Sequence, residues 1–255
     1  MSNILDRFTL NGKIAVVTGA SRGLGQGMAL ALAEAGADIV AVDLLSTEDT
    51  QRQVASLGRR CVSINVDLAE RKSIDSIISK ARASFSSLDI LVNCAGIIRR
   101  ADFTDFSEAD WDQVMRINID AVFLLSQAFV RDVIARKARA KVIHIASMLS
   151  FQGGIRVPSY TASKSAVQGL TRLMACELAD KGIQTNAIAP GYMATDNTAP
   201  LRADEKRSAS ILERIPEGRW GTPEDLKGAV VFLASAASDY VNGHTLAVDG
   251  GWLAR

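Results

Sequence analysis

The strongest constraint on the fold is a regular alternation of short apolar runs with longer stretches of helical character. Seven apolar runs recur along the chain, at residues 14–17, 39–43, 61–67, 90–93, 141–146, 185–190 and 245–248. Runs that are apolar throughout are typical of strands buried on both faces of a parallel sheet. The helical stretches between them fit crossover connections. We therefore expect an α/β fold, a doubly wound, seven-stranded parallel sheet with helices on both faces.

Length and composition favour one domain spanning residues 1–255. The chain is 48% hydrophobic and 22% charged, and no linker or low-complexity tract interrupts it. A formal net charge of +1 gives no basic excess for binding a nucleic-acid backbone. No apolar run is long enough to span a bilayer, and the first seven residues lack an apolar signal core. We expect a cytoplasmic protein that binds neither nucleic acid nor membrane.

Cysteine and histidine usage gives no sign of a metal site. Cys61, Cys94 and Cys176 lack metal-ligand spacing, so reduced thiols are expected. His144 and His244 both lie in apolar, strand-like runs and are interpreted as structural residues.

A glycine-rich segment follows the first apolar run and opens a helical stretch. Gly19, Gly23 and Gly25 stand where a backbone must approach a pyrophosphate at a helix N-terminus, whose free N–H groups and dipole favour anions. Candidate cofactor contacts in this segment are Gly19, Ser21, Arg22, Gly23, Leu24 and Gly25. The segment predicts a dinucleotide site on a sheet of the Rossmann type.

Asp43, which ends the second run, is the predicted determinant of cofactor choice. An acidic residue there hydrogen-bonds the ribose hydroxyls of the adenosine and repels a 2′-phosphate. Arg22 points the other way, because a basic residue in the glycine segment can contact that phosphate. We expect NAD(H) rather than NADP(H), since Asp43 occupies the more decisive place.

Tyr160 and Lys164 stand four residues apart in Tyr-Thr-Ala-Ser-Lys. On a helix they would share one face, one turn from each other. A phenol ordinarily titrates near pH ~10, and a neighbouring cation lowers its pKa toward neutrality. Ser147 precedes them at the end of an apolar run, and Asn118 lies in the helical stretch before that run.

Ser, Tyr and Lys in this order, after such a glycine segment, resemble the short-chain dehydrogenase/reductase family. Further segments match its motifs: Asp67-Leu68, Asn93-Cys94-Ala95-Gly96, and the Pro-Gly-x-x-x-Thr stretch at 190–195. Cys94 departs from the family pattern, which has a second Asn there. The resemblance implies that Asp67 and Leu68 hold the adenine. It also assigns cofactor contacts to Asn93, Ala95, Gly96, Tyr160, Lys164, Met193 and Thr195.

The resemblance also implies reversible hydride transfer between a secondary alcohol and a ketone. Tyr160 would be the acid or base, and Lys164 would lower its pKa and hold the nicotinamide ribose. Ser147 would stabilise the charge developing on the reacting oxygen, and Asn118 would position a proton-relay water.

Members of the family that act on deoxy sugar acids resemble this chain further, at residues 96–100, 147–160, 219–221 and 249–255. This implies interconversion of 2-keto-3-deoxygluconate and its 2,5-diketo form. Candidate substrate contacts are Ser147, Gln152, Arg156, Tyr160 and Arg100. An Arg can hold a carboxylate with two parallel hydrogen bonds. Alternatives are a gluconate 5-dehydrogenase, a 3-oxoacyl-carrier-protein reductase, and a non-catalytic nucleotide sensor on the same fold.

Two further expectations concern the last third of the chain. Residues 191–202 are irregular and rich in Gly, Pro, Asn and Thr, which favours a substrate lid. Trp252 and Leu253 are apolar enough to suggest that a neighbouring subunit covers them. Together with the family's usual assembly, they favour a homotetramer.

Overall fold

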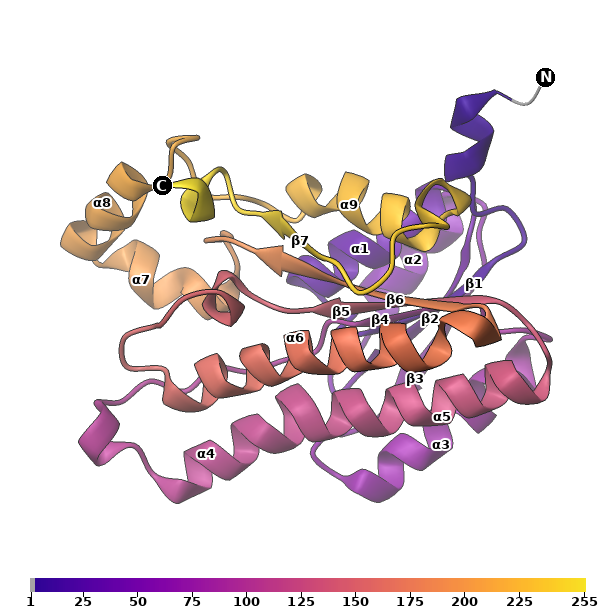
Figure 1. The fold of residues 1–255 in the computed structure, drawn as a ribbon, viewed down its shortest axis with the longest axis horizontal. Coiled ribbons are helices and arrows are strands. Elements are labelled where there is room, and N and C mark those ends of the chain that lie inside the picture. The colour runs from indigo at the N-terminus through magenta and orange to yellow at the C-terminus, as the bar shows by residue number, and fades with distance from the viewer. Residues whose placement is uncertain (1–2) are drawn as a thin grey trace.

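A seven-stranded parallel sheet organises the computed structural model, which describes residues 3–255. The strand order is β3-β2-β1-β4-β5-β6-β7 (Figure 1). The strands are β1 (Ile14–Thr18), β2 (Asp38–Asp43), β3 (Cys61–Asn65), β4 (Ile90–Asn93), β5 (Ala140–Ile145), β6 (Ile183–Pro190) and β7 (Thr245–Val248). This is the sheet that the seven apolar runs predict. Its winding direction reverses between β1 and β4.

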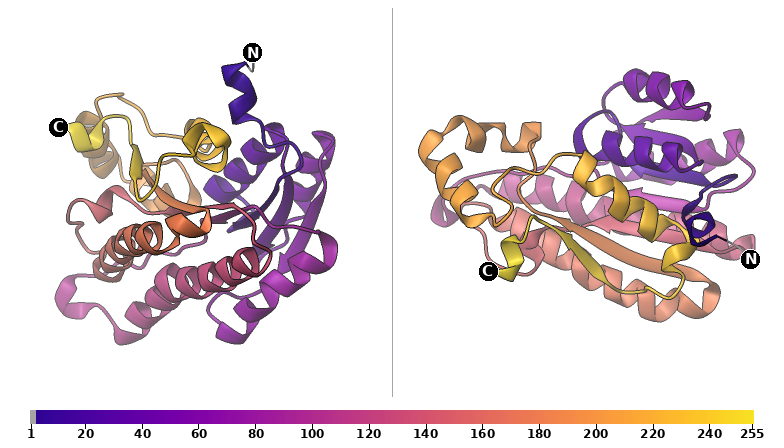
Figure 2. Two further views of the ribbon diagram at one scale, coloured as in Figure 1. Left: turned by 45° about the vertical axis from the view of Figure 1, so that its right-hand side comes forward. Right: turned by 90° about the horizontal axis from the view of Figure 1, so that it is seen from above.

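Helices cover both faces of the sheet (Figures 1 and 2). One face carries α1 (Gly23–Glu34), α2 (Glu48–Ser56) and α9 (Glu224–Ala234). The other carries α3 (Arg71–Ser84), α4 (Glu108–Met115), α5 (Ala121–Ala135) and α6 (Pro158–Leu178). Two short helices, α7 (Ala199–Ala203) and α8 (Glu205–Arg214), stand apart beyond the end of β6. Within residues 3–255, no helix combines the length and the apolar character needed to cross a membrane.

Alternate side chains of the central strands build two cores, one on each face. On β1, Ala15 and Val17 pack against α1 and α9, whereas Val16 packs toward α3 and α5. All residues of β1, β4, β5 and β6 are buried, which explains why these runs are mostly apolar. The last strand is only partly buried, as befits a sheet edge.

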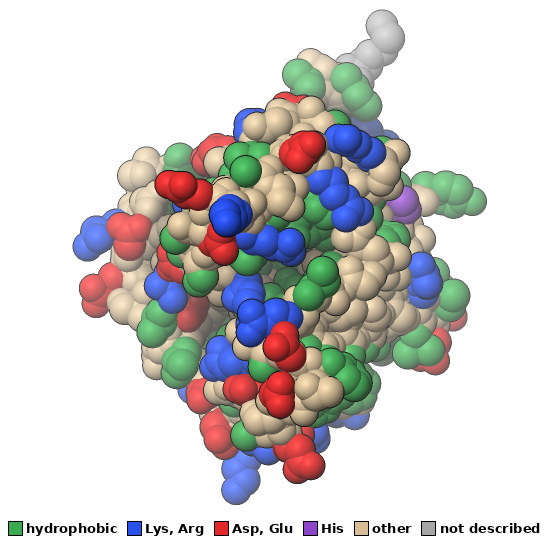
Figure 3. Space-filling view, turned by 90° about the vertical axis from the view of Figure 1, so that its left-hand side faces the viewer, with side chains coloured by type: hydrophobic (Ala, Val, Ile, Leu, Met, Phe, Trp, Pro, Cys, Tyr) green, Lys and Arg blue, Asp and Glu red, His purple; other side chains and the backbone are tan. Residues whose placement is uncertain are grey.

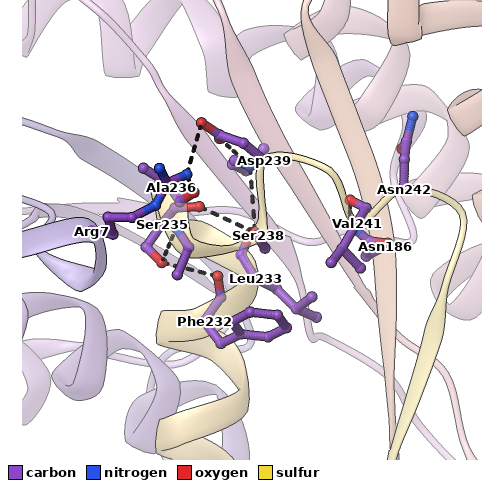
Figure 4. A network of polar contacts seen from close by, with 12 residues as sticks. Arg7, Asn186, Phe232, Leu233, Ser235, Ala236, Ser238, Asp239, Val241 and Asn242 are labelled. Atoms are coloured by element: carbon purple, nitrogen blue, oxygen red, sulfur yellow. Dashed lines mark hydrogen bonds and ion pairs between the residues drawn. The ribbon is translucent and has the colours of Figure 1, made fainter. Parts of the chain in front are cut away.

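The loop that follows α9 is fastened to the rest of the sheet by polar side chains (Figure 4). Asn186 on β6 donates its amide to the carbonyl of Val241 at 2.8 Å. Asn242 accepts the backbone N–H of Thr185 at 2.8 Å. Arg7, from the 3-10 turn Ile4–Phe8, donates to the carbonyl of Ala236 at 2.6 Å. These bonds fix the edge strand β7 and, with it, the segment that follows it.

The helical stretch around Asn118 is not one continuous α-helix. A π-helical turn, η3 (Arg116–Asp120), joins α4 to α5. Single π turns inside α-helices are rare and often mark functional sites.

The expectation that Trp252 needs a neighbouring subunit to cover it is wrong. The side chain is 4% exposed and packs inside its own chain, against Met148, Ile211 and Ile215. The sequence pattern showed that this indole must be covered, but not that the covering surface lies on the same chain.

Candidate active site

The candidate site lies at the carboxyl edge of the sheet, where β1 and β4 diverge. Thr18, the last residue of β1, accepts the backbone N–H groups of Cys94 and Ala95 through Oγ1, at 3.0 and 3.1 Å. These bonds join the glycine segment to the loop after β4. Sequence reasoning did not single out Thr18, although it directly precedes Gly19.

The glycine segment has no room for side chains. Gly19 adopts φ +69°, and a Cβ there would lie 3.0 Å from the backbone of Ala95. A Cβ at Gly25, at the start of α1, would collide with the carbonyl oxygen of Gly19. This close approach of backbones at a helix N-terminus fits a pyrophosphate.

Asp43, at the end of β2, faces this segment. Its carboxylate accepts the backbone N–H of Ser21 at 2.9 Å and that of Leu45 at 2.9 Å. The carboxylate is therefore held beside the loop, at the place where the fold puts an adenosine ribose. Arg22 instead pairs with Asp196 at 2.8 Å, and both side chains are largely exposed.

The remaining predicted contacts of the nucleotide border the same edge. Asp67 and Leu68 follow β3, and the Asp67 carboxylate accepts the N–H of Ala69 at 2.8 Å. Met193, after β6, is buried and bridges to Gly221, while Thr195 lies nearest to Gly23. The residues present thus fit a dinucleotide: a crowded glycine segment, a fixed carboxylate at β2, and a loop after β6 that reaches Gly23.

Ser147 follows β5 and caps the 3-10 turn η4 (Met148–Ser150). Its Oγ accepts the N–H of Leu149 at 3.1 Å, so the hydroxyl proton remains available for another acceptor. The Ser147 N–H donates to Ser150 Oγ at 3.3 Å, and Ser150 Oγ donates to the carbonyl of Lys164 at 2.7 Å. Ser150, a residue that sequence reasoning missed, therefore connects Ser147 to the turn that carries Lys164.

Tyr160 and Lys164 lie one turn apart on α6, as their spacing predicts. Lys164 Nζ is 5.6 Å from the centre of the Tyr160 ring. It is buried and donates to the carbonyl of Ile145 at 2.6 Å. The helix begins with Pro158, whose fixed φ suits a first helical turn. Ser147, Tyr160 and Lys164 are thus brought together from β5 and α6.

Burial dominates the electrostatics of this group. It raises the pKa of Tyr160, opposed by hydrogen bonding from Ser147 and by the positive charge of Arg100. It lowers the pKa of Lys164 to about 8. The expected lowering of the Tyr160 pKa by Lys164 stays a prediction.

Cys94, which departs from the family pattern, lies behind this group. Burial raises the pKa of its thiol to about 12, opposed by the charge of Lys164. The thiol is therefore neutral at physiological pH and adds no charge beside the amine.

Asn118 lies in the π-helical turn, and its side chain fastens the loop after β4. Its Oδ1 accepts the N–H of Ile97 at 2.9 Å, and its Nδ2 donates to the Ile97 carbonyl at 2.9 Å and to Ser163 Oγ at 3.2 Å. A Cβ at Gly96 would lie 3.3 Å from Asn118 Oδ1 and 3.6 Å from Lys164 Nζ. The turn thus joins three parts of the site: the loop after β4, α6 and the Lys164 amine.

Asn93, at the end of β4, is buried beneath the site. Its Nδ2 lies 3.0 Å from Ser126 Oγ and 3.1 Å from His144 Nδ1. Burial lowers the pKa of His144 to about 3. The histidine is therefore a neutral core residue, in accord with its interpretation as structural.

The predicted substrate residues differ in their surroundings. Arg100 donates to the carbonyl of Asn197 at 3.0 Å. Burial lowers its pKa, opposed by interactions with Tyr160 and Tyr192, so it stands near the Tyr160 phenol. Arg156 is exposed and pairs with Asp102 at 2.9 Å. Gln152 lies 3.4 Å from Arg214 on α8.

Basic side chains gather on this side of the molecule. Figure 3 shows Lys and Arg around a hollow in the surface that carries α7 and α8. Arg100, in the loop after β4, bonds the Asn197 carbonyl, Arg202 on α7 bonds the Thr195 carbonyl, and Arg214 on α8 bonds Gln152. The arrangement favours a small anionic ligand.

Comparison with known proteins identifies the family. A family model described as Enoyl-(Acyl carrier protein) reductase matches residues 19–253. The chain is 62% identical to the 2-dehydro-3-deoxy-D-gluconate 5-dehydrogenase of Escherichia coli (strain K12), over 99% of this chain and 100% of that protein. The chain belongs to the short-chain dehydrogenase/reductase family. It is therefore an oxidoreductase.

Solved structures of the family agree with this assignment. A candidate 2-deoxy-D-gluconate 3-dehydrogenase of Agrobacterium tumefaciens, with bound NADP, is 53% identical, with a TM-score of 0.93 and coverage of 98% of this chain and 100% of that one. A gluconate 5-dehydrogenase of Burkholderia cenocepacia J2315, in complex with NADP and tartrate, is 42% identical, with a TM-score of 0.94 and coverage of 99% and 100%. These relatives confirm a short-chain fold that binds a nicotinamide cofactor.

Proposed function

We propose that this enzyme interconverts a secondary alcohol and a ketone on a deoxy sugar acid of the 2-keto-3-deoxygluconate type, with NAD(H). The observation that carries the proposal is the meeting of Ser147, Tyr160 and Lys164 beside a glycine segment shaped for a dinucleotide. A non-catalytic nucleotide sensor would have no use for this triad, which is complete.

In the proposed mechanism Tyr160 exchanges a proton with the reacting oxygen. The cofactor supplies hydride transfer when bound. The Ser147 hydroxyl, whose oxygen already accepts the Leu149 N–H, donates its proton to the substrate oxygen and stabilises the charge that develops there. The Lys164 ammonium and the Arg100 guanidinium favour the phenolate when Tyr160 acts as a base.

Asn118 supports the site in this proposal from behind Lys164. Its side-chain bonds to Ile97 and Ser163 hold the π-helical turn against α6. The turn is then placed to hold a proton-relay water near the Lys164 amine, the role that the family resemblance implies.

The substrate proposal rests on charge and on the relatives. Arg100 stands near Tyr160, and Gln152 borders the same region, so a carboxylate could lie between the basic side chains of the rim. The curated relatives at 62% and 52% identity, from Escherichia coli and Bacillus subtilis, are 2-dehydro-3-deoxy-D-gluconate 5-dehydrogenases. We favour Arg100 over Arg156 as the carboxylate ligand, because Arg156 is engaged by Asp102.

The choice of NAD rests on Asp43 and Arg22. The Asp43 carboxylate is fixed beside Ser21, where it would hydrogen-bond ribose hydroxyls and repel a 2′-phosphate. The Arg22 guanidinium, which could attract that phosphate, is neutralised by Asp196. Bound NADP in the Agrobacterium and Burkholderia structures favours the other cofactor, so the initial rates with NAD and with NADP must be compared.

The proposal includes a homotetramer working in the cytoplasm. The family resemblance implies the assembly, and exposed apolar side chains on α5 and α6, Phe123, Ile134 and Leu173, offer surface for it.

Initial rates with a panel of substrates test the proposed function. The panel contains 2-keto-3-deoxygluconate, 2-deoxygluconate, gluconate, a neutral sugar and a 3-hydroxyacyl thioester, each with NAD and with NADP. We expect turnover on the deoxy sugar acids with NAD. Turnover on gluconate would favour the gluconate 5-dehydrogenase alternative, and turnover on the thioester with NADP would replace both the substrate and the cofactor assignments.

A further inference from the structure

The segment after β7, residues 249–255, packs against the helix α8 rather than extending into solvent. Asp249 fixes the turn of this segment, since its carboxylate accepts the N–H groups of Gly251 and Leu253, both at 2.9 Å. The Gly250 carbonyl accepts the N–H of Glu217 at 3.1 Å. Arg255 donates to the carbonyl of Glu213 at 3.0 Å. One backbone bond and one side-chain bond thus attach the segment to the end of α8 and to the residues that follow it.

The contact is close enough to require glycine. Gly251 adopts φ +87°, and a Cβ there would lie 3.0 Å from Cγ of Pro216. The backbone of the segment therefore lies directly against the residues that follow α8.

Trp252 belongs to the apolar surface on which α8 rests. Ile211 is the buried residue of this amphipathic helix, and Ile215 follows it. Both belong to a small core with Met148 and Trp252, separate from the two cores of the sheet. The guanidinium of Arg214 lies 4.1 Å above the Trp252 ring.

This small core also contacts the active site. Met148 directly follows the catalytic Ser147. Tyr192, from the loop after β6, packs edge-on against Trp252 with ring centres 4.8 Å apart. One indole thus touches the turn after Ser147, the loop after β6 and the helix α8, which carries the basic side chain next to Gln152.

We propose that residues 249–255 form a strap that fixes α8 over the substrate side of the active site, and that Trp252 is its positioning residue. The proposal rests on the proposed function for the identity of the substrate side. Trp252 acts through α8 and Met148 and does not touch reacting atoms. Loosening the strap should therefore weaken binding of the sugar acid while leaving the nucleotide contacts in place.

The test compares Trp252→Ala with Trp252→Phe and with Phe85→Ala. The Phe variant keeps an aromatic ring but loses the second ring of the indole and its N–H, which has no partner in the described structure. Phe85 is a matched control, because it is also 4% exposed but packs in the core beneath α3 and α5. Amide hydrogen exchange of residues 205–214 is measured without ligands, and KM is measured for 2-keto-3-deoxygluconate and for NAD.

In Trp252→Ala we expect the amide exchange rate in α8 to rise by about tenfold or more, because opening of this helix no longer costs its packing against the indole. We expect the KM for the sugar acid to rise by about the same factor, because α8 is held less firmly beside the substrate. The KM for NAD should stay unchanged, and Trp252→Phe should resemble the wild type. Equal amide exchange of α8 in Trp252→Ala and Phe85→Ala would contradict the proposal that residues 249–255 fix this helix. Should Trp252→Ala be insoluble, Trp252→Leu is measured in its place, with an increase expected in the same two quantities.

The exchange measurement needs no substrate, so it separates the two proposals. If wild-type enzyme fails to turn over any sugar acid, the proposed function fails, while the α8 exchange still decides whether the strap exists.

Discussion

At the scale of single residues, the active site depends on hydroxyl groups whose hydrogen bonds fix their direction. Ser147 accepts one backbone N–H through its oxygen, which leaves its proton available for another acceptor. Ser150 then bonds the backbones of both Ser147 and Lys164. The order of Ser, Tyr and Lys in the sequence indicated Ser147 and Lys164. It did not indicate Ser150, because a serine near a turn has no distinguishing signal of its own.

Removal of the Ser150 hydroxyl should disturb catalysis more than binding. In Ser150→Ala, we expect kcat to fall by about 10- to 100-fold, since small displacements of reacting groups cost rate steeply. The KM for NAD should not change, and Ser150→Thr, which keeps a hydroxyl, should recover part of the rate. Steady-state kinetics measure both parameters.

Ser165, the residue after Lys164 on α6, offers a matched control. Its Oγ donates to the Leu149 carbonyl at 3.5 Å, between the same turn and the same helix, but it contacts no catalytic residue. A kcat for Ser165→Ala as low as that for Ser150→Ala would show that general loosening of α6, and not the link to Ser147 and Lys164, sets the rate.

At the scale of elements, the sequence predicted the strands well and the connections less well. Apolar runs locate buried strands reliably because both faces of a central strand must be apolar. The π-helical turn at Asn118 could not be predicted, since Trp111 to Ala135 shows one continuous helical pattern and the interruption follows from tertiary bonds to Ile97 and Ser163.

The irregular segment after β6, residues 191–202, is expected to be a lid. In the structure it contains a 3-10 turn, Asp196–Thr198, and most of α7, and α8 follows it. The pattern of residues 191–202 indicated loop chemistry, while α8 is amphipathic and depends on a partner from the far end of the chain. Contacts between distant segments leave no periodic signal. This is also why the covering of Trp252 was assigned to another subunit.

At the scale of the whole molecule, burial of His144 couples stability to pH. The pKa of this histidine falls from 6.5 to about 3 in the folded protein. Between these values the unfolded chain binds a proton that the folded chain does not, so the free energy of unfolding decreases as pH falls below 6.5. Above pH 6.5 this contribution is fully present and constant.

Replacement of His144 by a residue that does not titrate should reduce the loss of unfolding free energy as the pH falls. Over pH 6.5 to 4, wild-type enzyme should lose about 1.4 kcal/mol per pH unit more than His144→Gln does, the value of one differentially bound proton. Urea unfolding at several pH values measures this difference. The slopes, not the absolute stabilities, are compared, because the substitution also alters packing. Parallel curves would mean that His144 does not titrate on unfolding in this range.

The most direct measurement of the central claim is single-turnover and steady-state kinetics of Tyr160→Phe, together with NADH binding. The substitution removes one hydroxyl and keeps the ring beside Lys164. If Tyr160 is the acid and base of a hydride-transfer reaction on a sugar acid, kcat should fall by about 10²–10⁴-fold while NADH binds as in the wild type. Turnover close to that of the wild type, with the cofactor bound, would contradict the account.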